Sequence, residues 1–336
     1  MRSLRRPRVQ VPTLTSRGAA THCQNQDAQP EQRRFDSHWN EADVRGALLA
    51  MQGGTCAYCS RTIAARDRGD VDHFRPKGRV REDPTHGGYW WLAYSFDNYL
   101  HSCKPCNQDH KGNQFPMRPR GRHLRYQDTR RLAREARLLL DPCADPVDEW
   151  LQVTIPSPDD AHELVKLIPS PTLAKTAQGQ VSATARMFRW NLDVDLLCER
   201  REVLDAVLSA LDDGRDHDAR ELAVRYQRHS LVARSVLERC RPALLPSPSE
   251  EFDWLLGQLV ERLYEILELL ERCPGGDTRN ERDRDEIGWA LAVLWADPPA
   301  GTPEAVEAFL TAQSEDLREW VRSKRDALVS AAAGAA

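Results

Sequence analysis

Two short cysteine pairs constrain how this chain can fold. Each pair has the Cys-x₂-Cys spacing, first at Cys56 and Cys59 and again at Cys103 and Cys106, with 43 residues between them. Two such turns supply the four thiolates that a structural zinc ion binds in a tetrahedron. The alternative, four ordinary buried cysteines, rarely gives this spacing twice in one stretch. We therefore expect a zinc-stapled segment over about residues 55–116, with an insertion folded between the pairs.

The remaining cysteines have no such spacing. They stand singly, and we expect them to be small apolar residues of the fold: Cys23, Cys143, Cys198, Cys240 and Cys273. The odd total of nine argues against a disulfide framework. Thioredoxin-like chemistry would need a βαβ pattern around one pair, and a zinc deaminase would need His-x-Glu ahead of Pro-Cys-x₂-Cys. Neither pattern is present, so structural zinc remains the interpretation.

The sequence gives no sign of export or of membrane insertion. The basic start, Met1 to Pro7, has no apolar stretch behind it. No segment reaches the ~18 apolar residues that a membrane span needs. These features favour a cytoplasmic protein without a membrane partner.

Charge is distributed unevenly along the chain. Residues 1–140 hold 25 Lys and Arg against 14 Asp and Glu, whereas residues 141–336 hold 22 against 37. The basic part therefore predicts a polyanionic partner such as a nucleic acid, and the acidic part predicts none over most of its length.

Composition and periodicity divide the 336 residues into four regions. Residues 1–35 are polar and aperiodic, and predict a flexible basic lead-in. Residues 36–140 hold the cysteine pairs. Residues 141–181 are rich in Pro and Asp and predict a linker with short strands. Residues 182–336 predict an acidic helical domain for partner docking or regulation, which makes the expected fold mainly α.

Several helices can be placed from apolar spacing and from Pro or Gly interruptions. Near-helical spacing over residues 36–52 stops at Gly53-Gly54. From Phe252 to Leu270, apolar residues recur every three or four positions between charges. Such a stripe is usually core, with a partner-binding face as the alternative. We expect further helices at 193–212, 218–240, 281–297 and 303–331.

An arginine-rich stretch follows the second cysteine pair. Eight arginines lie between residues 118 and 137, and the pattern is helical from Thr129 onward. Two interpretations stay open: a solvated helix face, or a stripe that contacts phosphates beside an active site.

An Asp-His dyad lies between the cysteine pairs, at the end of a strand expected over Gly69 to Phe74. A sharp turn at Pro76 and Gly78 would let Asp72 and His73 reach one site, although strand neighbours normally face opposite ways. A carboxylate suits Mg²⁺ or Mn²⁺, and a histidine can take a proton from water near neutral pH. Such a pair is commonplace, and its place between two zinc-binding pairs is what favours a functional site.

Polar residues near the second cysteine pair can complete this site. Asn107 would open a short helix and offer a neutral oxygen ligand beside Asp72. Asn98 is placed to hold a backbone turn. Lys111 lies one helical turn beyond Asn107 and can contact phosphate.

Other histidines have weaker assignments. His110, three residues after Asn107, is an alternative metal ligand. His86 and His101 have no clear partners and are expected at the surface.

Taken together, these residues resemble the HNH endonucleases, whose active site is a ββα-metal finger. The matching segments are Cys56-x₂-Cys59, Asp72-His73-Phe74-Arg75-Pro76-Lys77, Asp97-Asn98-Tyr99-Leu100, Cys103-x₂-Cys106-Asn107 and Lys111-Gly112-Asn113. A further stretch, Gly88 to Tyr94 with Phe115-Pro116, is similar to HNH proteins of Septu and retron-type antiphage systems. The resemblance covers residues 36–205.

This resemblance implies a metal-dependent endonuclease. His73 would be the general base, and Asp72 and Asn107 would hold one Mg²⁺ or Mn²⁺ ion. Asn98 would be the supporting asparagine. The family often has His where this chain has Asn107, which changes the ligand set of the ion.

The resemblance also implies partners. Cationic side chains would bind the flanking phosphates, namely Arg75, Lys77, Arg79, Arg81 and Lys111. Septu-type HNH proteins act beside an ATPase, which would dock on the acidic helical region. DNA is favoured over RNA as substrate. An effector that cleaves RNA or tRNA, a stand-alone restriction enzyme and a catalytically inactive zinc-finger module that binds nucleic acid are the alternatives.

Overall fold

The computed structural model describes residues 1–29, 32–64, 67–156, 164–272, 278–299 and 303–334. Two compact units divide the chain, and both are discontinuous in sequence. The first comprises Met1–Leu4, Gly54–Trp90 and Ser102–Ser247; the second comprises Arg5–Gly53, Trp91–His101 and Pro248–Ala336. These units do not follow the four regions expected from composition. The expected helical region 182–336 in particular is shared between them.

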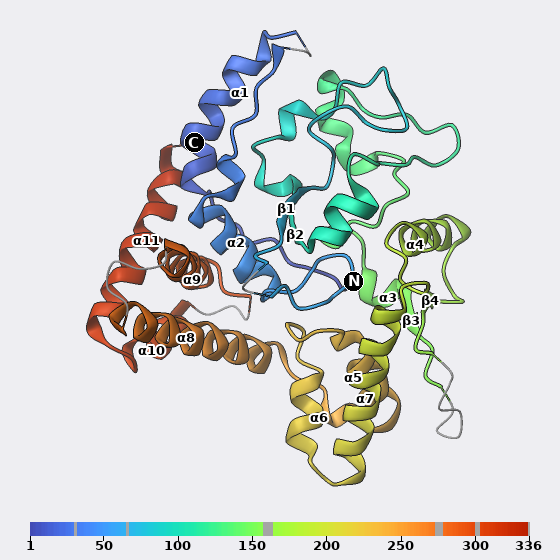
Figure 1. Ribbon diagram of the computed structural model, residues 1–336, viewed down its shortest axis with the longest axis vertical. Helices are drawn as coiled ribbons and strands as arrows, with labels where there is room; N and C mark the ends of the chain where they lie inside the picture. The colour runs from blue at the N-terminus through green and yellow to red at the C-terminus, as the bar shows by residue number, and fades with distance from the viewer. Residues whose placement is uncertain (30–31, 65–66, 157–163, 273–277, 300–302, 335–336) are drawn as a thin grey trace. The chain divides into compact units, whose positions relative to one another are not determined.

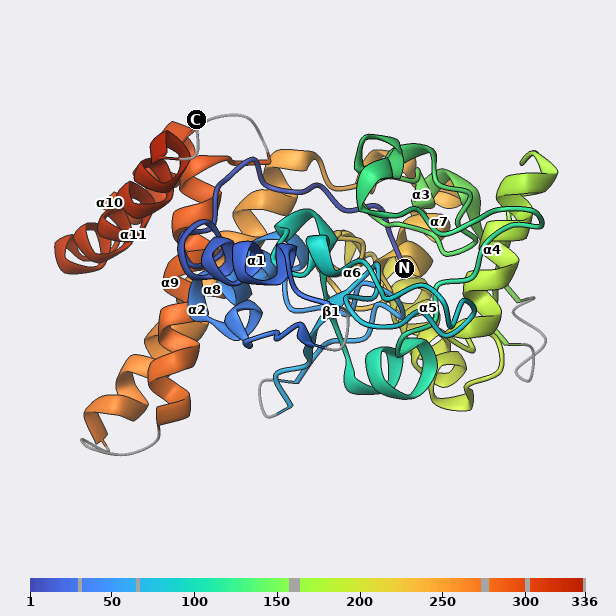
Figure 2. The same ribbon diagram turned by 90° about the horizontal axis from the view of Figure 1, so that it is seen from above.

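The second unit is a helical assembly around α9 (Thr278–Ala296). Three helices pack against α9, as Figures 1 and 2 show: α2 (Ala42–Gln52), α8 (Pro248–Arg272) and α11 (Glu315–Gly334). Glycines permit two of these contacts. A Cβ on Gly46 of α2 would lie 2.5 Å from Trp289 Cβ, and one on Gly288 would lie 2.3 Å from the Trp320 ring. The apolar stripe of α8, including Leu256 and Leu263, is buried as expected.

Smaller elements complete this unit. They are a π-helical turn at Leu14–Gly18, α1 (Ala19–Gln26), β2 (Tyr99–Ser102, whose last residue belongs to the first unit), α10 (Pro303–Thr311) and 3-10 turns at His38–Asn40, Phe96–Asn98 and Trp90–Leu92, of which Trp90 belongs to the first unit. The helix expected over 36–52 is confirmed as α2. It ends where Gly53 takes φ 62°, and the Gly53 N–H donates to the Leu49 carbonyl at 2.7 Å.

The first unit carries both cysteine pairs and the Asp-His dyad. Its elements are β1 (Asp70–His73), a π-helix η6 (Pro105–Lys111), a 3-10 helix η7 (Tyr126–Arg134), α3 (Val147–Trp150), β3 (Leu151–Val153), β4 (Leu167–Pro169), α4 (Lys175–Met187), α5 (Val194–Asp212), α6 (Asp216–Leu222), α7 (Ser230–Cys240) and a 3-10 turn η8 (Pro242–Leu244). The expected strand at β1 and the expected helix at α5 are both confirmed. Strands β3 and β4 pair antiparallel, with Gln152 opposite Ile168, which confirms short strands between residues 141 and 181.

The expectation of a flexible lead-in over residues 1–35 is wrong for the part that the structure describes. Val11 and Leu14 are buried, and the chain runs from the π-helical turn directly into α1. The Thr13 N–H donates to Asp43 Oδ2 at 2.7 Å, which fixes this segment against α2. The few apolar residues of this segment have no helical spacing, because contacts with distant parts of the chain bury them and not the face of an amphipathic helix.

Two other expected helices are each broken in two. Over 218–240, α6 and α7 are separated by a turn in which His229 adopts a left-handed φ of 48°. Over 303–331, α10 stops at Thr311, and the Ser314 hydroxyl accepts a hydrogen bond from the Leu317 N–H at 3.2 Å. A serine cap of this kind begins a new helix.

The single cysteines were also misassigned. Cys23, Cys198 and Cys240 are exposed, and so they are not apolar filling of the core. Cys143 is partly buried, and Cys273 lies outside the described residues. None of the helices that the structure describes has the length and apolar character that crossing a membrane requires.

Candidate metal centre and Asp-His site

The two cysteine pairs come together in one cluster. The four Sγ atoms of Cys56, Cys59, Cys103 and Cys106 all lie within 4.8 Å of one another. Three of these cysteines are buried and Cys103 is partly exposed. Within the described residues, these four cysteines are the cluster of His, Cys, Asp or Glu side chains that lie close enough together to bind one metal ion.

Local turns shape each half of the cluster. The Ser60 N–H donates to the Cys56 carbonyl at 3.0 Å, which closes the first turn, and Ser60 has a left-handed φ of 63°. In the second pair, the Asn107 N–H donates to the Cys103 carbonyl at 3.0 Å as the chain enters η6. Both turns therefore direct their sulfur atoms to a common centre.

The donor set fits zinc. Zinc in structural sites binds four thiolates in a tetrahedron. Burial opposes a charge on Cys56, but hydrogen bonds from the neighbouring cysteine sulfurs outweigh burial and lower the pKa of its thiol.

Buried charges lie close to this cluster. Arg200 is 1% exposed, and its Nη1 donates to the Trp190 carbonyl at 2.6 Å. Burial lowers the pKa of Arg200 to about 10, while the nearby Cys59 acts to raise it. Glu199 forms an ion pair with Arg61, whose Nε lies 2.8 Å from Glu199 Oε1, and Glu199 Oε2 lies 2.9 Å from His229 Nε2. Arg61 and Arg200 therefore place positive charge near Cys59, which opposes the negative charge that the thiolates of a metal site carry.

Asp72 is held by two buried partners. Its Oδ1 accepts from Lys111 Nζ at 2.9 Å, and its Oδ2 accepts from the Tyr58 hydroxyl. Burial, followed by the Asp72 charge, raises the pKa of Tyr58. Lys111 Nζ also donates to the His73 carbonyl at 2.8 Å. One ammonium thereby links η6 to both residues of the dyad.

A second contact joins η6 to the same strand. Asp70 Oδ2 accepts from Asn107 Nδ2 at 2.9 Å and from Gln108 Nε2 at 2.8 Å. Asp70 and Asp72 are two residues apart in β1 and so share one face of the strand, which η6 covers. The Asn107 side chain therefore contacts Asp70, whereas Asp72 contacts Lys111 and Tyr58.

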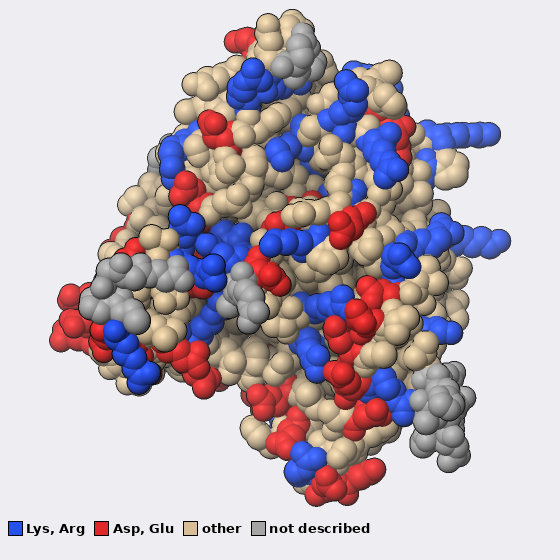
Figure 3. Space-filling view, in the orientation of Figure 1, with Lys and Arg blue, Asp and Glu red and all other residues tan. Residues whose placement is uncertain are grey.

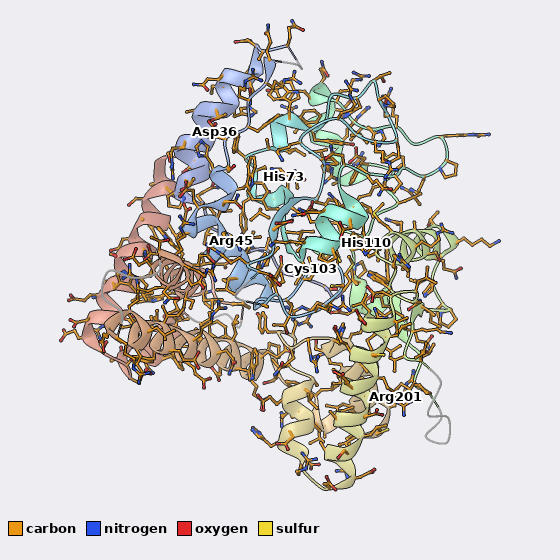
Figure 4. All side chains as sticks on the ribbon, viewed as in Figure 1. Asp36, Arg45, His73, Cys103, His110 and Arg201 are labelled. Carbon is orange, nitrogen blue, oxygen red and sulfur yellow. The ribbon has the colours of Figure 1, made fainter. Side chains whose placement is uncertain are left out.

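His73 ends β1, and alternation along the strand places its side chain opposite Asp72. It is 6% exposed. Figure 4 labels His73 together with Cys103 and His110 of the same unit. His110 is partly buried on η6 and belongs to no metal-binding group among the described residues.

The residues expected to contact nucleic acid differ in exposure. Arg75 is buried, with its Nε 2.8 Å from Glu135 Oε2, and Lys111 has no exposed side-chain surface. Lys77 is partly buried, and burial lowers its pKa. Of the five, the two with exposed side chains are Arg79 and Arg81. The structure thus gives Arg75 and Lys111 internal ion pairs in place of the expected surface contacts.

Asn98 belongs to the second unit. It is 2% exposed, its N–H donates to the Ser95 carbonyl at 2.9 Å, and its Nδ2 lies 3.4 Å from the Leu92 carbonyl. These contacts hold a backbone turn, as the sequence suggests.

His86 is not a surface residue. It is 2% exposed, and its Nε2 lies 2.8 Å from the Leu124 carbonyl. Burial lowers its pKa. His101 is partly buried.

Sequence reasoning missed several residues that organise this unit. Asp70 and Tyr58 had a usable signal, because the first shares a strand face with Asp72 and the second lies inside a cysteine pair. Glu135 had none. It lies 60 residues from Arg75, yet it binds Arg75 and accepts from the Tyr89 hydroxyl at 2.5 Å.

Most of the arginine-rich stretch is exposed. Arginines at 120, 122, 125, 130, 131 and 134 reach solvent. Arg137 differs, because it is buried and forms a bidentate ion pair with Asp145. Its Nη1 and Nη2 donate to Asp145 Oδ2 and Oδ1 at 2.7 and 2.9 Å. Lys and Arg side chains are visible over much of the face that Figure 3 shows.

Comparison with known proteins gives one informative likeness. The chain is 34% identical over 122 residues to the Septu protein PtuB of Bacillus mycoides (strain KBAB4). The matched part is 35% of this chain and 40% of that protein, so the chain spans well under half of this relative's length. No family model and no solved structure matches.

Proposed function

We propose that this chain is an HNH-type nuclease that acts in antiphage defence together with an ATPase partner. The likeness to a Septu protein supports the defence role, and the resemblance of the Asp-His and cysteine motifs to HNH enzymes supports the chemistry. The likeness covers a minority of both chains, so activity, substrate and partner are all part of the proposal.

One observation carries the proposal. Lys111 Nζ contacts Asp72 Oδ1 at 2.9 Å and the His73 carbonyl at 2.8 Å, and Lys111 ends the helix that begins at the second cysteine pair. A metal held by the cysteines would fix η6, and η6 would in turn fix the backbone of the dyad. A catalytic base needs such support because small displacements of a reacting group cost large factors in rate.

The proposed reaction is hydrolysis of a phosphodiester. A ring nitrogen of His73 takes a proton from water, and the water oxygen forms a bond to phosphorus. The bond from phosphorus to the 3′-oxygen breaks, and that oxygen is protonated by solvent, leaving a 5′-phosphate. Proton transfer by a positioned base contributes about 10²–10⁴-fold to such rates.

The catalytic ion expected at Asp72 and Asn107 does not fit these residues as they are arranged. Both oxygens of Asp72 accept hydrogen bonds, and the Lys111 ammonium lies where a divalent cation would approach. The Asn107 amide is directed to Asp70. Binding of Mg²⁺ or Mn²⁺ at Asp72 would require Lys111 to leave it, and the proposed reaction assigns no step to the ion.

The test is cleavage of plasmid DNA and of total tRNA in parallel, with and without Mg²⁺ or Mn²⁺. The wild type should cleave DNA, and His73→Ala should lose about 10²–10⁴-fold in rate. His217→Ala, which changes a histidine of α6, is the matched control and should retain full activity. Cleavage of tRNA in place of DNA would identify an RNA-directed effector. Equal cleavage by wild type and His73→Ala would remove His73 as the base.

The partner is tested separately. The full chain carrying an affinity tag should co-purify an ATPase from cells that express the neighbouring genes. Should no ATPase co-purify while cleavage proceeds, the nuclease stands alone and the partner is removed from the proposal.

A further inference from the structure

A basic cleft lies in the first unit, apart from the cysteines and the dyad. Its volume is about 530 Å³, and it is formed between the turn at residues 118–121 and the first turns of α4. The residues that define its chemistry are Arg118, Arg120, Leu138, Lys175, Thr176 and Gly179. It shares no lining residue with the cysteine cluster or with β1.

The first wall presents two arginines from one tight turn. The Arg118 N–H donates to the Ala136 carbonyl and the Gly121 N–H donates to the Arg118 carbonyl, both at 2.8 Å. Arg120 has a left-handed φ of 64°, and a Cβ on Gly121 would lie 2.9 Å from the Arg118 carbonyl oxygen. Arg118 and Arg120 therefore both line the cleft from one turn.

The second wall is the start of α4. This helix of 13 residues begins at Lys175, and the Ala174 side chain provides no cap for the first N–H groups. Uncapped N–H groups and the helix dipole favour an anion at this end. Thr176 adds a hydroxyl, and the Cβ position of Gly179 faces open space.

The charges around the cleft point to an anionic ligand. Three cationic side chains line it, and none of its lining residues is acidic. The Nε atom of Arg118 is buried and has no hydrogen-bond partner among the described residues. Arg118 as a whole is partly exposed, and a guanidinium group binds phosphate oxygens through charge-assisted hydrogen bonds.

Apolar surface accompanies these charges. Pro119, Ala136 and Leu138 line the same cleft. A ligand that matches both features carries a phosphate and a flat ring whose face can pack on apolar side chains, as a nucleotide does.

We propose that this cleft binds a nucleoside phosphate, either free or as one unit of a nucleic-acid strand. If the ligand is a nucleic-acid strand, the cleft holds part of the strand that the proposed nuclease cleaves, and this form of the proposal rests on the proposed function. If the ligand is free, the cleft binds it as a small regulatory ligand.

Two probes distinguish these sources. The first is the fluorescent nucleotide mant-ATP, and the second is a short fluorescein-labelled oligonucleotide with phosphorothioate linkages, which resist cleavage. Binding to the zinc-loaded full chain is followed by fluorescence anisotropy without added Mg²⁺ or Mn²⁺, so the readout does not depend on catalysis.

The variants alter charge at one open position. Gly179→Glu introduces a carboxylate into the cleft, and Gly179→Gln introduces a neutral side chain of the same size. We expect Gly179→Glu to bind the matching probe at least about tenfold more weakly than Gly179→Gln. The double variant Arg120→Ala/Lys175→Ala should lose a similar factor, whereas Arg241→Ala, which changes an exposed arginine just after α7 and outside the cleft, should bind as the wild type does.

Every result decides the proposal. A charge-dependent loss with mant-ATP assigns the cleft to a free nucleotide, and one with the oligonucleotide alone assigns it to a strand. Equal binding by the Glu and Gln variants, or binding of neither probe by the wild type, overturns it. If binding depends on charge but the protein cleaves no nucleic acid, the proposed nucleotide site stands and the proposed nuclease activity is rejected.

Discussion

Lys111 Nζ lies 2.9 Å from Asp72 Oδ1, and the two side chains are only 0% and 4% exposed. An ion pair this deeply buried contributes little net stability when intact but is costly when broken, because the remaining charge has no compensation. The pair also connects β1 to η6, beside the contacts that Asn107 and Gln108 make with Asp70.

Removing the lysine alone should therefore destabilise the protein strongly. We expect Lys111→Met to lower the free energy of unfolding by about 3–5 kcal/mol. The double variant Lys111→Met/Asp72→Asn should recover most of this loss, because no buried charge is then unpaired. Urea denaturation at a fixed zinc concentration measures both. Equal losses for the single and the double variant would show that the charge is not the cause.

Loss of one cysteine should abolish metal binding. We expect a single equivalent of zinc per chain, since four thiolates complete a structural site. Cys103→Ser should lose the zinc and melt at a markedly lower temperature. Cys198→Ser, at an exposed single cysteine, is the control and should keep both. Metal analysis and thermal melting give the result, and a Cys103→Ser protein that retains zinc and melting temperature contradicts the cluster.

Stability should fall as the solution is acidified, partly through His229. Burial lowers the pKa of this histidine from 6.5 to about 4, although its contact with Glu199 opposes the shift. The unfolded chain therefore binds a proton at pH values where the folded chain does not. The contribution of neutral His229 to the free energy of unfolding is therefore complete above about pH 6.5. It is lost as the pH falls toward 4, by up to roughly 3 kcal/mol.

The measurement compares unfolding free energies at pH 7 and at pH 5.5. His229→Gln should show a shallower decrease than the wild type, because the titrating group is gone. His217→Gln is the control, and its decrease should match that of the wild type. Parallel decreases in all three proteins would mean that His229 titrates alike in the folded and unfolded chains.

A methyl group at the α2–α9 contact should be poorly tolerated. A Cβ on Gly46 would lie 2.5 Å from Trp289 Cβ and 2.6 Å from the Glu286 carbonyl oxygen. Overpacking of this kind costs about 1–3 kcal/mol, so Gly46→Ala should lower the melting temperature. Gly257→Ala in α8, where nothing lies within 4 Å, should leave the melting temperature unchanged or raise it. A stable Gly46→Ala protein would indicate that α2 can shift on α9.

The sequence predicted the parts of this fold that depend on short-range pattern. The Cys-x₂-Cys spacing located the cysteine cluster, and period and glycine signals located β1, α2 and α8. These predictions succeeded because each rests on residues close together in the chain.

What failed depends on contacts between distant residues. Arg75 looks like a surface cation from its neighbours, and only the fold brings Glu135 to it. Likewise Lys111 is buried because Asp72, 39 residues away, accepts from it. No local pattern distinguishes a lysine that faces phosphate from one that pairs with a buried carboxylate.

The chain passes from one compact unit to the other at five places, after Leu4, Gly53, Trp90, His101 and Ser247. No single contiguous stretch of the gene therefore encodes either unit. A fragment cut to contain both cysteine pairs necessarily carries residues 91–101 of the second unit without their companions. Truncation is the usual way to find which part of a protein carries an activity, but here it would disrupt both units at once. Point substitutions in the intact chain are therefore the better experiment.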